Sequence, residues 1–159
     1  MRLAADTWVD VPRERVFPFF ADAANLQVLT PPWLRFQIDT PTPIDMYPGR
    51  QISYRIRVHG VPMRWTSEIS RYEPPAMFVD EQRRGPYRTW IHTHRFVEER
   101  GGTRLLDDVE FEMFAGWLVG PLVARDLRAI FTYRHETLLK IFGQPQPWPP
   151  PAVTIHRHP

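Results

Sequence analysis

The sequence predicts an α+β fold in which a curved antiparallel sheet of about seven strands packs against one long C-terminal helix. Several segments between residues 34 and 114 alternate apolar with polar residues and are separated by short turns, a pattern typical of antiparallel hairpins. Residues 117–142 carry the one long helical signal, with apolar residues at spacings of three and four. A sheet that needs one covered face and a helix of this length predict two layers with a gap between them.

The chain begins with a predicted strand over residues 2–11, followed by two short helices. Pro12 stands where the first turn of a helix tolerates proline, and the helical pattern after it ends near residues 21–22. A second short helix is expected over residues 24–29, because the prolines at 31 and 32 disfavour its continuation. These helices lie between the first and second strands and are expected to close the gap between sheet and long helix.

Six further strands follow before the long helix. They are predicted over residues 34–39, 51–59, 63–69, 78–83, 88–99 and 104–114. The first hairpin is expected to turn at Gly60-Val61, which would place Val58 opposite Met63 and Ile56 opposite Trp65.

Residues 1–143 are predicted to form a single domain, and residues 144–159 a proline-rich C-terminal tail. The tail sequence QPQPWPPPAVTIHRHP disfavours helix and favours extended structure, so a solvated appendage is preferred over a segment anchored through Trp148. A homo-oligomer formed through the tail or a sheet edge is also open.

Composition excludes several classes of function. The formal charge is +2 and the basic residues are scattered, so no nucleic-acid surface is expected. The absence of cysteine excludes disulfides and thiolate metal sites. The chain has no apolar run of 18 residues and no apolar leader, which predicts a cytoplasmic protein without stable membrane insertion. Aromatic residues make up 13% of the chain, enough to fill a core or to line a pocket.

The segment YRTWIHTHRF, residues 87–96, places two histidines on the same strand face as two large aromatic residues. If the turn at residues 84–87 sets the register, Asp80 faces His92 and Phe78 faces His94. If the turn at Gly101-Gly102 pairs Phe96 with Asp107, then His94 faces Val109 and His92 faces Phe111. Both pairings direct the same polar set toward the gap between sheet and helix: Asp80, Gln82, His92, His94 and Asp107.

Four interpretations of this polar set remain open. His92, His94 and Asp80 would chelate a metal, although no metal signature accompanies them and no metal or other cofactor is expected. An imidazole oriented by Asp80 would serve as a general base. The set would also suit the polar head group of a ligand, or a buried network that satisfies itself. Arg134, on the inner stripe of the helix, would pair with Asp107 or Asp80, or bind an anionic ligand.

The sequence resembles the helix-grip fold of the START, Bet v 1-like and polyketide cyclase superfamily, in its bacterial SRPBCC branch. Four segments carry the resemblance, which covers about residues 1–143: VPRERVFPFFADAANLQVLTPPWL at 11–34, YRIRVHGVPMRWTSEI at 54–69, FVDEQRRGPYRTWIHTHRF at 78–96 and RAIFTYRHETL at 128–138.

The resemblance implies a ligand cavity between the curved sheet and the long helix. Alternation places a set of apolar side chains on its walls, beside the polar set: Tyr54, Ile56, Trp65, Phe78, Trp90, Phe96, Val109, Phe111, Leu122, Ile130 and Phe131. The expected function is to bind or carry a hydrophobic small molecule such as a lipid, isoprenoid, quinone or polyketide-like compound. The alternative is a cyclase or dehydratase that uses His92 or His94 as base, with Asp80 as its partner.

Overall fold

The computed structural model describes residues 1–114, 116–143 and 152–156. It confirms the α+β helix-grip fold, with a curved antiparallel sheet, a long C-terminal helix and short helices after the first strand. The elements are, in chain order, β1 (Arg2–Val9), α1 (Arg13–Ala21), the short 3-10 turn η1 (Ala23–Asn25), α2 (Leu26–Leu29), the 3-10 turn η2 (Pro32–Leu34), β2 (Gln37–Ile38), β3 (Gln51–Val58), β4 (Val61–Glu73), β5 (Met77–Arg84), β6 (Tyr87–Glu99), β7 (Gly102–Met113), α3 (Gly116–Ile141) and β8 (Ala152–His156).

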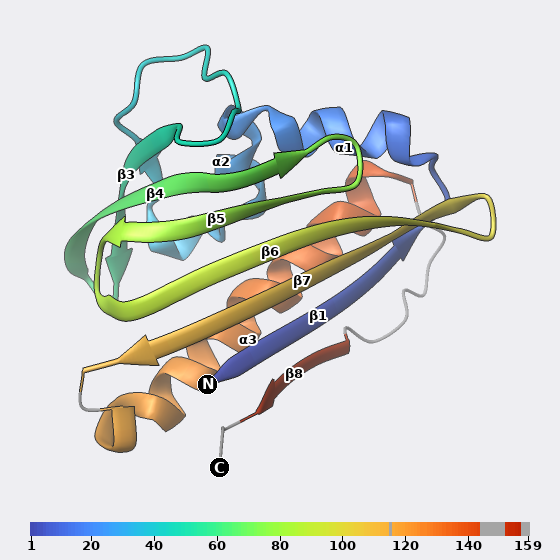
Figure 1. The fold of residues 1–159 in the computed structure, drawn as a ribbon. Coiled ribbons are helices and arrows are strands. Elements are labelled where there is room, and N and C mark those ends of the chain that lie inside the picture. Colours follow the sequence, from blue (N-terminus) through green and yellow to red (C-terminus); the bar gives the residue numbers. More distant parts are fainter. Residues whose placement is uncertain (115, 144–151, 157–159) are drawn as a thin grey trace.

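The strands form one sheet in the order β2-β3-β4-β5-β6-β7-β1-β8, and every neighbouring pair is antiparallel. The helix α3 runs along one face of this sheet, and α2 packs against α3 (Figure 1). None of the described helices is long and apolar enough to cross a membrane.

The eighth strand corrects the expected solvated tail. Residues 152–156 pair with β1, with Leu3 opposite Ile155 and Ala5 opposite Val153. The prolines of the tail disfavour regular structure, but the segment AVTIH that follows them is rich in β-branched residues, which favour a strand. Its valine and isoleucine pack against apolar residues of β1 and α3. Trp148, the anchor in the alternative interpretation, lies outside the described residues.

Two hairpins turn one residue earlier than expected. In the β3–β4 hairpin the turn is His59-Gly60, and in the β6–β7 hairpin it is Arg100-Gly101; all four residues have positive φ. This is the geometry of a two-residue turn that matches the twist of the flanking strands.

The earlier turns move both pairings by two residues. Tyr54 therefore lies opposite Trp65, and His94 lies opposite Asp107, whereas the sequence had predicted Ile56 and Phe96 for these positions. Because side chains alternate with a period of two, the predicted faces survive the shift. The β5–β6 pairing is as predicted, with Asp80 opposite His92 and Phe78 opposite His94.

The hydrophobic core lies on the α3 side of the sheet and anchors α1. The rings of Phe17 and Phe20 pack edge-on against Phe96 of β6, with ring centroids 5.1 and 4.9 Å apart. Leu138 and Leu139 of α3 belong to the same cluster and are almost fully buried. A second cluster, around Val109, Phe111, Leu127 and Phe131, packs β7 against α3.

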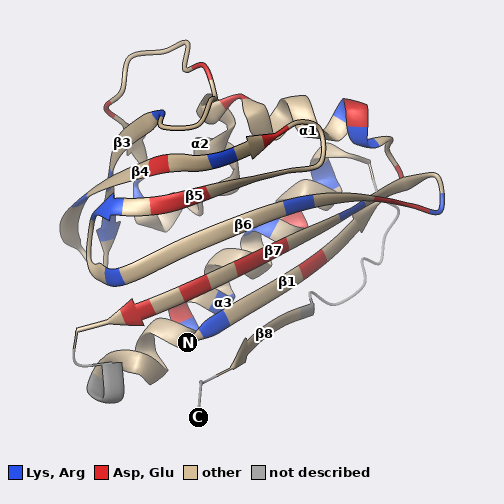
Figure 2. Cartoon of the chain, viewed as in Figure 1, with Lys and Arg blue, Asp and Glu red and all other residues tan. Residues whose placement is uncertain are grey.

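The outer face of the sheet carries charges of both signs. Figure 2 shows acidic and basic residues interspersed along β1, β4, β5, β6 and β7. Several form ion pairs between neighbouring strands, such as Arg104 with Asp6 and Arg83 with Glu68. This face is solvated, so the uncommon polar residues are those on the α3 side.

Candidate functional site

A cavity of about 520 Å³ lies between the sheet and α3, within the size range of small-molecule sites. Its lining comes from β3 to β6, from α3, and from the short helices between β1 and β2. Most of the lining side chains are apolar or aromatic. Many of the residues that were expected to line it do so: Tyr54, Ile56, Trp65, Phe78, Asp80, Trp90, His92, His94, Ile130, Phe131 and Arg134.

Other residues that the sequence placed on the wall lie outside it. Phe96, Val109 and Phe111 are each at most 2% exposed and fill the two core clusters instead. Leu122 is 44% exposed on the solvent side of α3. The stripe of apolar residues along a helix is wider than the surface that faces a cavity, so alternation alone does not separate core from lining.

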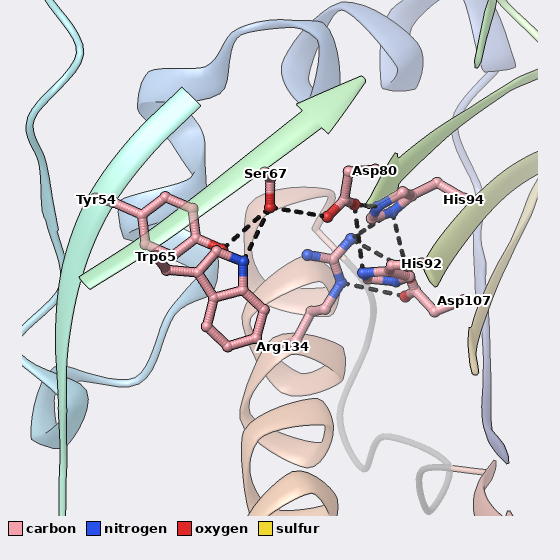
Figure 3. A network of polar contacts seen from close by, with 8 residues as sticks. All are labelled: Tyr54, Trp65, Ser67, Asp80, His92, His94, Asp107 and Arg134. Carbon is pink, nitrogen blue, oxygen red and sulfur yellow. Dashed lines mark hydrogen bonds and ion pairs between the residues drawn. The ribbon is translucent and has the colours of Figure 1, made fainter. Parts of the chain in front are cut away.

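Gln82 and Asp107 are displaced from the lining for different reasons. The side chain of Gln82 closes the β5–β6 turn, donating to the carbonyl of Tyr87 at 2.7 Å and accepting from its backbone N–H at 3.2 Å. Asp107 lies on β7, behind the histidines as seen from the cavity, and contacts the cluster described next (Figure 3).

Five ionisable side chains converge at one end of the cavity: Asp80, His92, His94, Asp107 and Arg134 (Figure 3). Nε2 of His92 lies 2.8 Å from Oδ1 of Asp107, and Nδ1 of His94 lies 3.1 Å from the same oxygen. Arg134 donates to both oxygens of Asp107, from Nε at 3.1 Å and from Nη2 at 3.2 Å. Asp107 therefore joins two strands and the helix through one carboxylate.

Asp80 forms the second centre of this cluster, on the cavity side. Its Oδ2 lies 2.8 Å from Nε2 of His94 but 3.6 Å from Nδ1 of His92. Of the two imidazoles that Asp80 was expected to orient, His94 is the one it contacts closely, whereas the close partner of His92 is Asp107. The two-residue shift of β7 brings Asp107 opposite His94, where its carboxylate reaches both imidazoles.

A short chain of hydrogen bonds continues from Asp80 along the cavity wall. The hydroxyl of Ser67 donates to Oδ1 of Asp80 at 3.3 Å and accepts from Nε1 of Trp65 at 3.1 Å. The hydroxyl of Tyr54 lies 3.4 Å from the same Ser67 oxygen (Figure 3). These contacts fix the orientation of two aromatic side chains and extend the polar end of the cavity.

The cluster lowers the pKa of both of its carboxyl groups. Burial alone would raise the pKa of Asp107, but Arg134 and the two imidazoles hold it well below its ordinary value. Burial likewise opposes ionisation of Asp80, whose pKa is nevertheless lowered by His94, His92 and Arg134. Both carboxylates are therefore ionised at neutral pH.

The pKa values of the two histidines are shifted in opposite directions. Burial lowers the pKa of both imidazoles, but for His94 the hydrogen bonds to Asp107 and Asp80 outweigh burial and raise the pKa. For His92, burial and the neighbouring charge of His94 outweigh the effect of Asp107, and its pKa is lowered. The arrangement favours a proton on His94 and a neutral His92.

The same residues have the composition of a metal site. Ligand atoms of Asp80, His92 and His94 all lie within 4.8 Å of one another, and Asp107 contacts the other ring nitrogen of each histidine. Two imidazoles and a carboxylate suit a divalent transition ion. In the structure these atoms are linked by a hydrogen bond between Asp80 and His94, so a metal would replace the proton that this bond requires.

Several lining or buried polar residues escaped the sequence analysis. Ser67 was visible as a polar residue at an inward position of β4, between Trp65 and Ile69, and this was a usable signal. His135 lies off the apolar stripe of the helix sequence, yet it is 5% exposed and its Nδ1 lies 2.8 Å from Oγ1 of Thr7. No local pattern foretells that contact, because its partners are 128 residues apart.

Comparison with known proteins places this architecture in a family. The family model described as polyketide cyclase/dehydrase and lipid transport matches residues 9–132. No curated protein matches the chain.

Solved structures share the fold at low sequence identity. Protein CV1439 of Chromobacterium violaceum has a TM-score of 0.71 and 14% identity, over 91% of this chain and 98% of that one. Protein Ms6760 of Mycobacterium smegmatis has a TM-score of 0.66 and 18% identity, over 89% and 90% of the two chains. Ara h 8.0201 has a TM-score of 0.62 and 14% identity, over 88% and 98%.

Proposed function

The chain belongs to the polyketide cyclase/dehydrase and lipid transport family, and on this premise we propose that it binds a hydrophobic small molecule in the cavity between the sheet and α3. The bound compound would be a lipid, isoprenoid, quinone or polyketide-like molecule. Its apolar part would contact the aromatic and aliphatic walls. Its polar part would meet the cluster of Asp80, His92, His94 and Arg134.

One observation carries the proposal: the cavity is lined mostly by apolar side chains and has a concentrated cluster of ionisable residues at one end. Small-molecule sites combine these two properties, since apolar walls supply affinity and a few polar groups fix orientation. The polar end is also held rigidly, because both histidines contact the buried carboxylate of Asp107. A ligand would therefore find its polar partners already in place.

The first test is native mass spectrometry of the protein purified from its own host, followed by extraction and identification of any bound compound. A stoichiometric hydrophobic molecule supports the proposal. A cavity-filling variant, Ile56→Trp, is expected to lose that molecule, because Ile56 lines the cavity. Val97→Trp is the matched control, since Val97 is 43% exposed and absent from the lining. Retention of the compound by Ile56→Trp would place it elsewhere.

An enzyme of the cyclase or dehydratase type is the second candidate, and the environment of His92 favours it. Asp107 contacts Nε2 of His92, while Nδ1 is 3.6 Å from Asp80, too far for a hydrogen bond. The pKa of His92 is lowered, so its neutral form has a lone pair available on Nδ1. A neutral imidazole oriented by a carboxylate is the arrangement of a general base.

Substitution of His92 separates the two candidates. His92→Ala in an enzyme would abolish turnover of a bound substrate while binding persists. In a carrier the same variant would weaken affinity and leave no turnover to lose. Product analysis after incubation with the compound recovered from the host therefore decides between them.

A further inference from the structure

The charged residues that line the cavity are unequally divided between the two signs. Of the described lining residues, Asp22, Asp80 and Asp126 carry carboxylates, whereas Arg134 is the one residue with a permanent positive charge. Histidines at positions 59, 92 and 94 complete the ionisable lining. The distribution of charge is the reverse of what an anionic ligand requires.

The positive charge of Arg134 is already compensated behind the cavity wall. Its Nε and Nη2 both donate to the carboxylate of Asp107, which is itself absent from the lining. Both side chains are buried, at 8% and 10% exposure, so water screens their attraction only weakly. A carboxylate entering the cavity would therefore have to compete with Asp107 for this guanidinium.

Asp80 is the ionised group that an entering ligand would meet first at the polar end. It lies on the cavity side of the cluster, and its partners are His94, His92 and Ser67. Among these partners, only a protonated His94 would neutralise the negative charge of the carboxylate. With that proton, the two aspartates, Arg134 and His94 sum to zero, and no positive charge is left over for a ligand.

A cationic ligand is disfavoured at the same place. The third guanidinium nitrogen of Arg134 points away from Asp107, toward Ser67 and Trp65 (Figure 3). It presents an N–H donor and a positive charge to the polar end of the cavity. An ammonium group near Asp80 would therefore also approach a guanidinium in a region of low dielectric constant.

Resting on the proposed function, we infer that the molecule bound in this cavity carries an uncharged polar group, a hydroxyl or carbonyl, at the end that meets Asp80 and Arg134. A hydroxyl is complementary to both: it donates to a carboxylate or to the neutral ring nitrogen of His92, and it accepts from the guanidinium. Fatty acids and other carboxylates are excluded by the charges of the lining. The selected class is thus hydrophobic alcohols, phenols and ketones.

The test compares ligands that share a body and differ in charge. 4-Phenylphenol, biphenyl-4-carboxylate and 4-phenylbenzylamine, together with dodecanol and dodecanoate, are titrated into the full chain at pH 7.5, where carboxylic acids are ionised. Tryptophan fluorescence reports binding, since Trp65 and Trp90 line the cavity. The neutral compound is expected to bind roughly tenfold or more tightly than its charged counterparts.

A variant that removes the charge of Asp80 tests whether this carboxylate causes the preference for neutral ligands. Asp80→Asn is expected to bring the affinity for biphenyl-4-carboxylate to at least that for 4-phenylphenol, because the remaining cluster then has positive charge to spare. Glu110→Gln is the matched control: it removes one negative charge from the exposed outer side of β7, and the preference for the phenol should persist. Circular dichroism and thermal unfolding verify that both variants are folded.

The outcomes separate the inference from its premise. If wild-type protein binds the carboxylates or the amine as tightly as the neutral compounds, the inference is overturned and the proposed function stands. If Asp80→Asn is folded and keeps the wild-type preference, the inference is also overturned, because the charge at Asp80 is not its cause. If no member of either series binds and the protein from its host carries no compound, the proposed function fails and the inference fails with it.

Discussion

Arg134 and Asp107 form a buried ion pair with two hydrogen bonds, one from Nε at 3.1 Å and one from Nη2 at 3.2 Å. The pair joins the C-terminal half of α3 to β7 and lies beside both histidines. Its geometry, with two parallel donors on one carboxylate, is the strong form of this interaction. The stability of the fold therefore depends on this pair, and in the proposed function the guanidinium of Arg134 also meets the ligand.

The first prediction concerns the loss of one partner. Arg134→Met should lower the free energy of unfolding by about 3–5 kcal/mol, because it leaves the buried Asp107 carboxylate without its cation. Combining it with Asp107→Leu should restore part of the loss, since no isolated charge then remains. Urea unfolding measures both. Arg104→Met, which breaks an exposed pair with Asp6, is the control and should change stability little. A double variant no more stable than Arg134→Met would contradict this account.

The second prediction concerns the loss of stability at acidic pH that the Asp107 carboxylate causes. Burial would raise the pKa of Asp107, but Arg134 and the two imidazoles hold it well below its ordinary value in the folded protein. Its contribution to stability is therefore complete above the ordinary carboxyl pKa of about 4 and is lost as the pH falls through the lower, folded value. Unfolding free energies measured from pH 5 downward should fall more steeply in wild-type protein than in Asp107→Asn. Equal slopes would show that other carboxylates dominate acid unfolding.

The third prediction concerns the order in which His92 and His94 lose their protons as the pH rises. The pKa of His94 is raised and that of His92 is lowered, both from the ordinary value of about 6.5. The stability due to His94 is complete below that value and is lost as the pH rises through the raised pKa. The stability due to His92 is complete above it and is lost as the pH falls through the lowered pKa.

Imidazole nitrogen NMR titrations measure this order directly. With assignments made from His92→Gln and His94→Gln, the resonances of His94 should titrate at higher pH than those of His92. The difference in unfolding free energy between wild-type protein and His94→Gln should also shrink as the pH rises above 6.5. The opposite order of titration would contradict this account, because it would mean that His92, and not His94, is the histidine that keeps its proton to higher pH.

The sequence predicted the faces of the strands better than their registers. The alternation in residues 87–96 correctly directed both histidines to the α3 side, because strand periodicity is local. In the β6–β7 hairpin the predicted register was wrong because two adjacent glycines offered two possible turns. Gly102 belongs to β7, and a Cβ there would lie 2.3 Å from the carbonyl oxygen of Val9, so this glycine serves close packing and not the turn. Arg100 takes the left-handed position instead, with φ of 54°.

The membership of the charged cluster was predictable, whereas its pairings were not. All five residues were identified from inward alternation on three strands and from the apolar stripe of the helix. Which carboxylate contacts which imidazole depends on the β6–β7 register, and a two-residue shift replaced Val109 by Asp107 opposite His94. Contacts between distant segments, such as Thr7 with His135, have no local signature at all.

The last prediction concerns β8, which pairs with β1 and covers its edge. Truncation after Gly143 removes Val153 and Ile155, which pack against apolar residues of β1 and α3. These side chains are only partly buried, so the loss should be about 1–3 kcal/mol, measured by urea unfolding. Truncation also exposes the backbone donors and acceptors of β1, and such an edge pairs readily with a second chain.

Light scattering after size-exclusion chromatography should therefore detect dimers or larger species of the truncated chain, with the full chain as reference. The full-length variant Val153→Ser/Ile155→Ser separates the two effects: it should lose stability but keep the edge covered and self-associate less than the truncated chain. Thr154→Ser, at an exposed position of the same strand, is the control and should behave as wild type. If truncation changes neither the unfolding midpoint nor the mass in solution, the β1–β8 pairing contributes nothing to the folded protein. The core of the sheet would then end at β1, as the proline-rich composition of the tail first indicated.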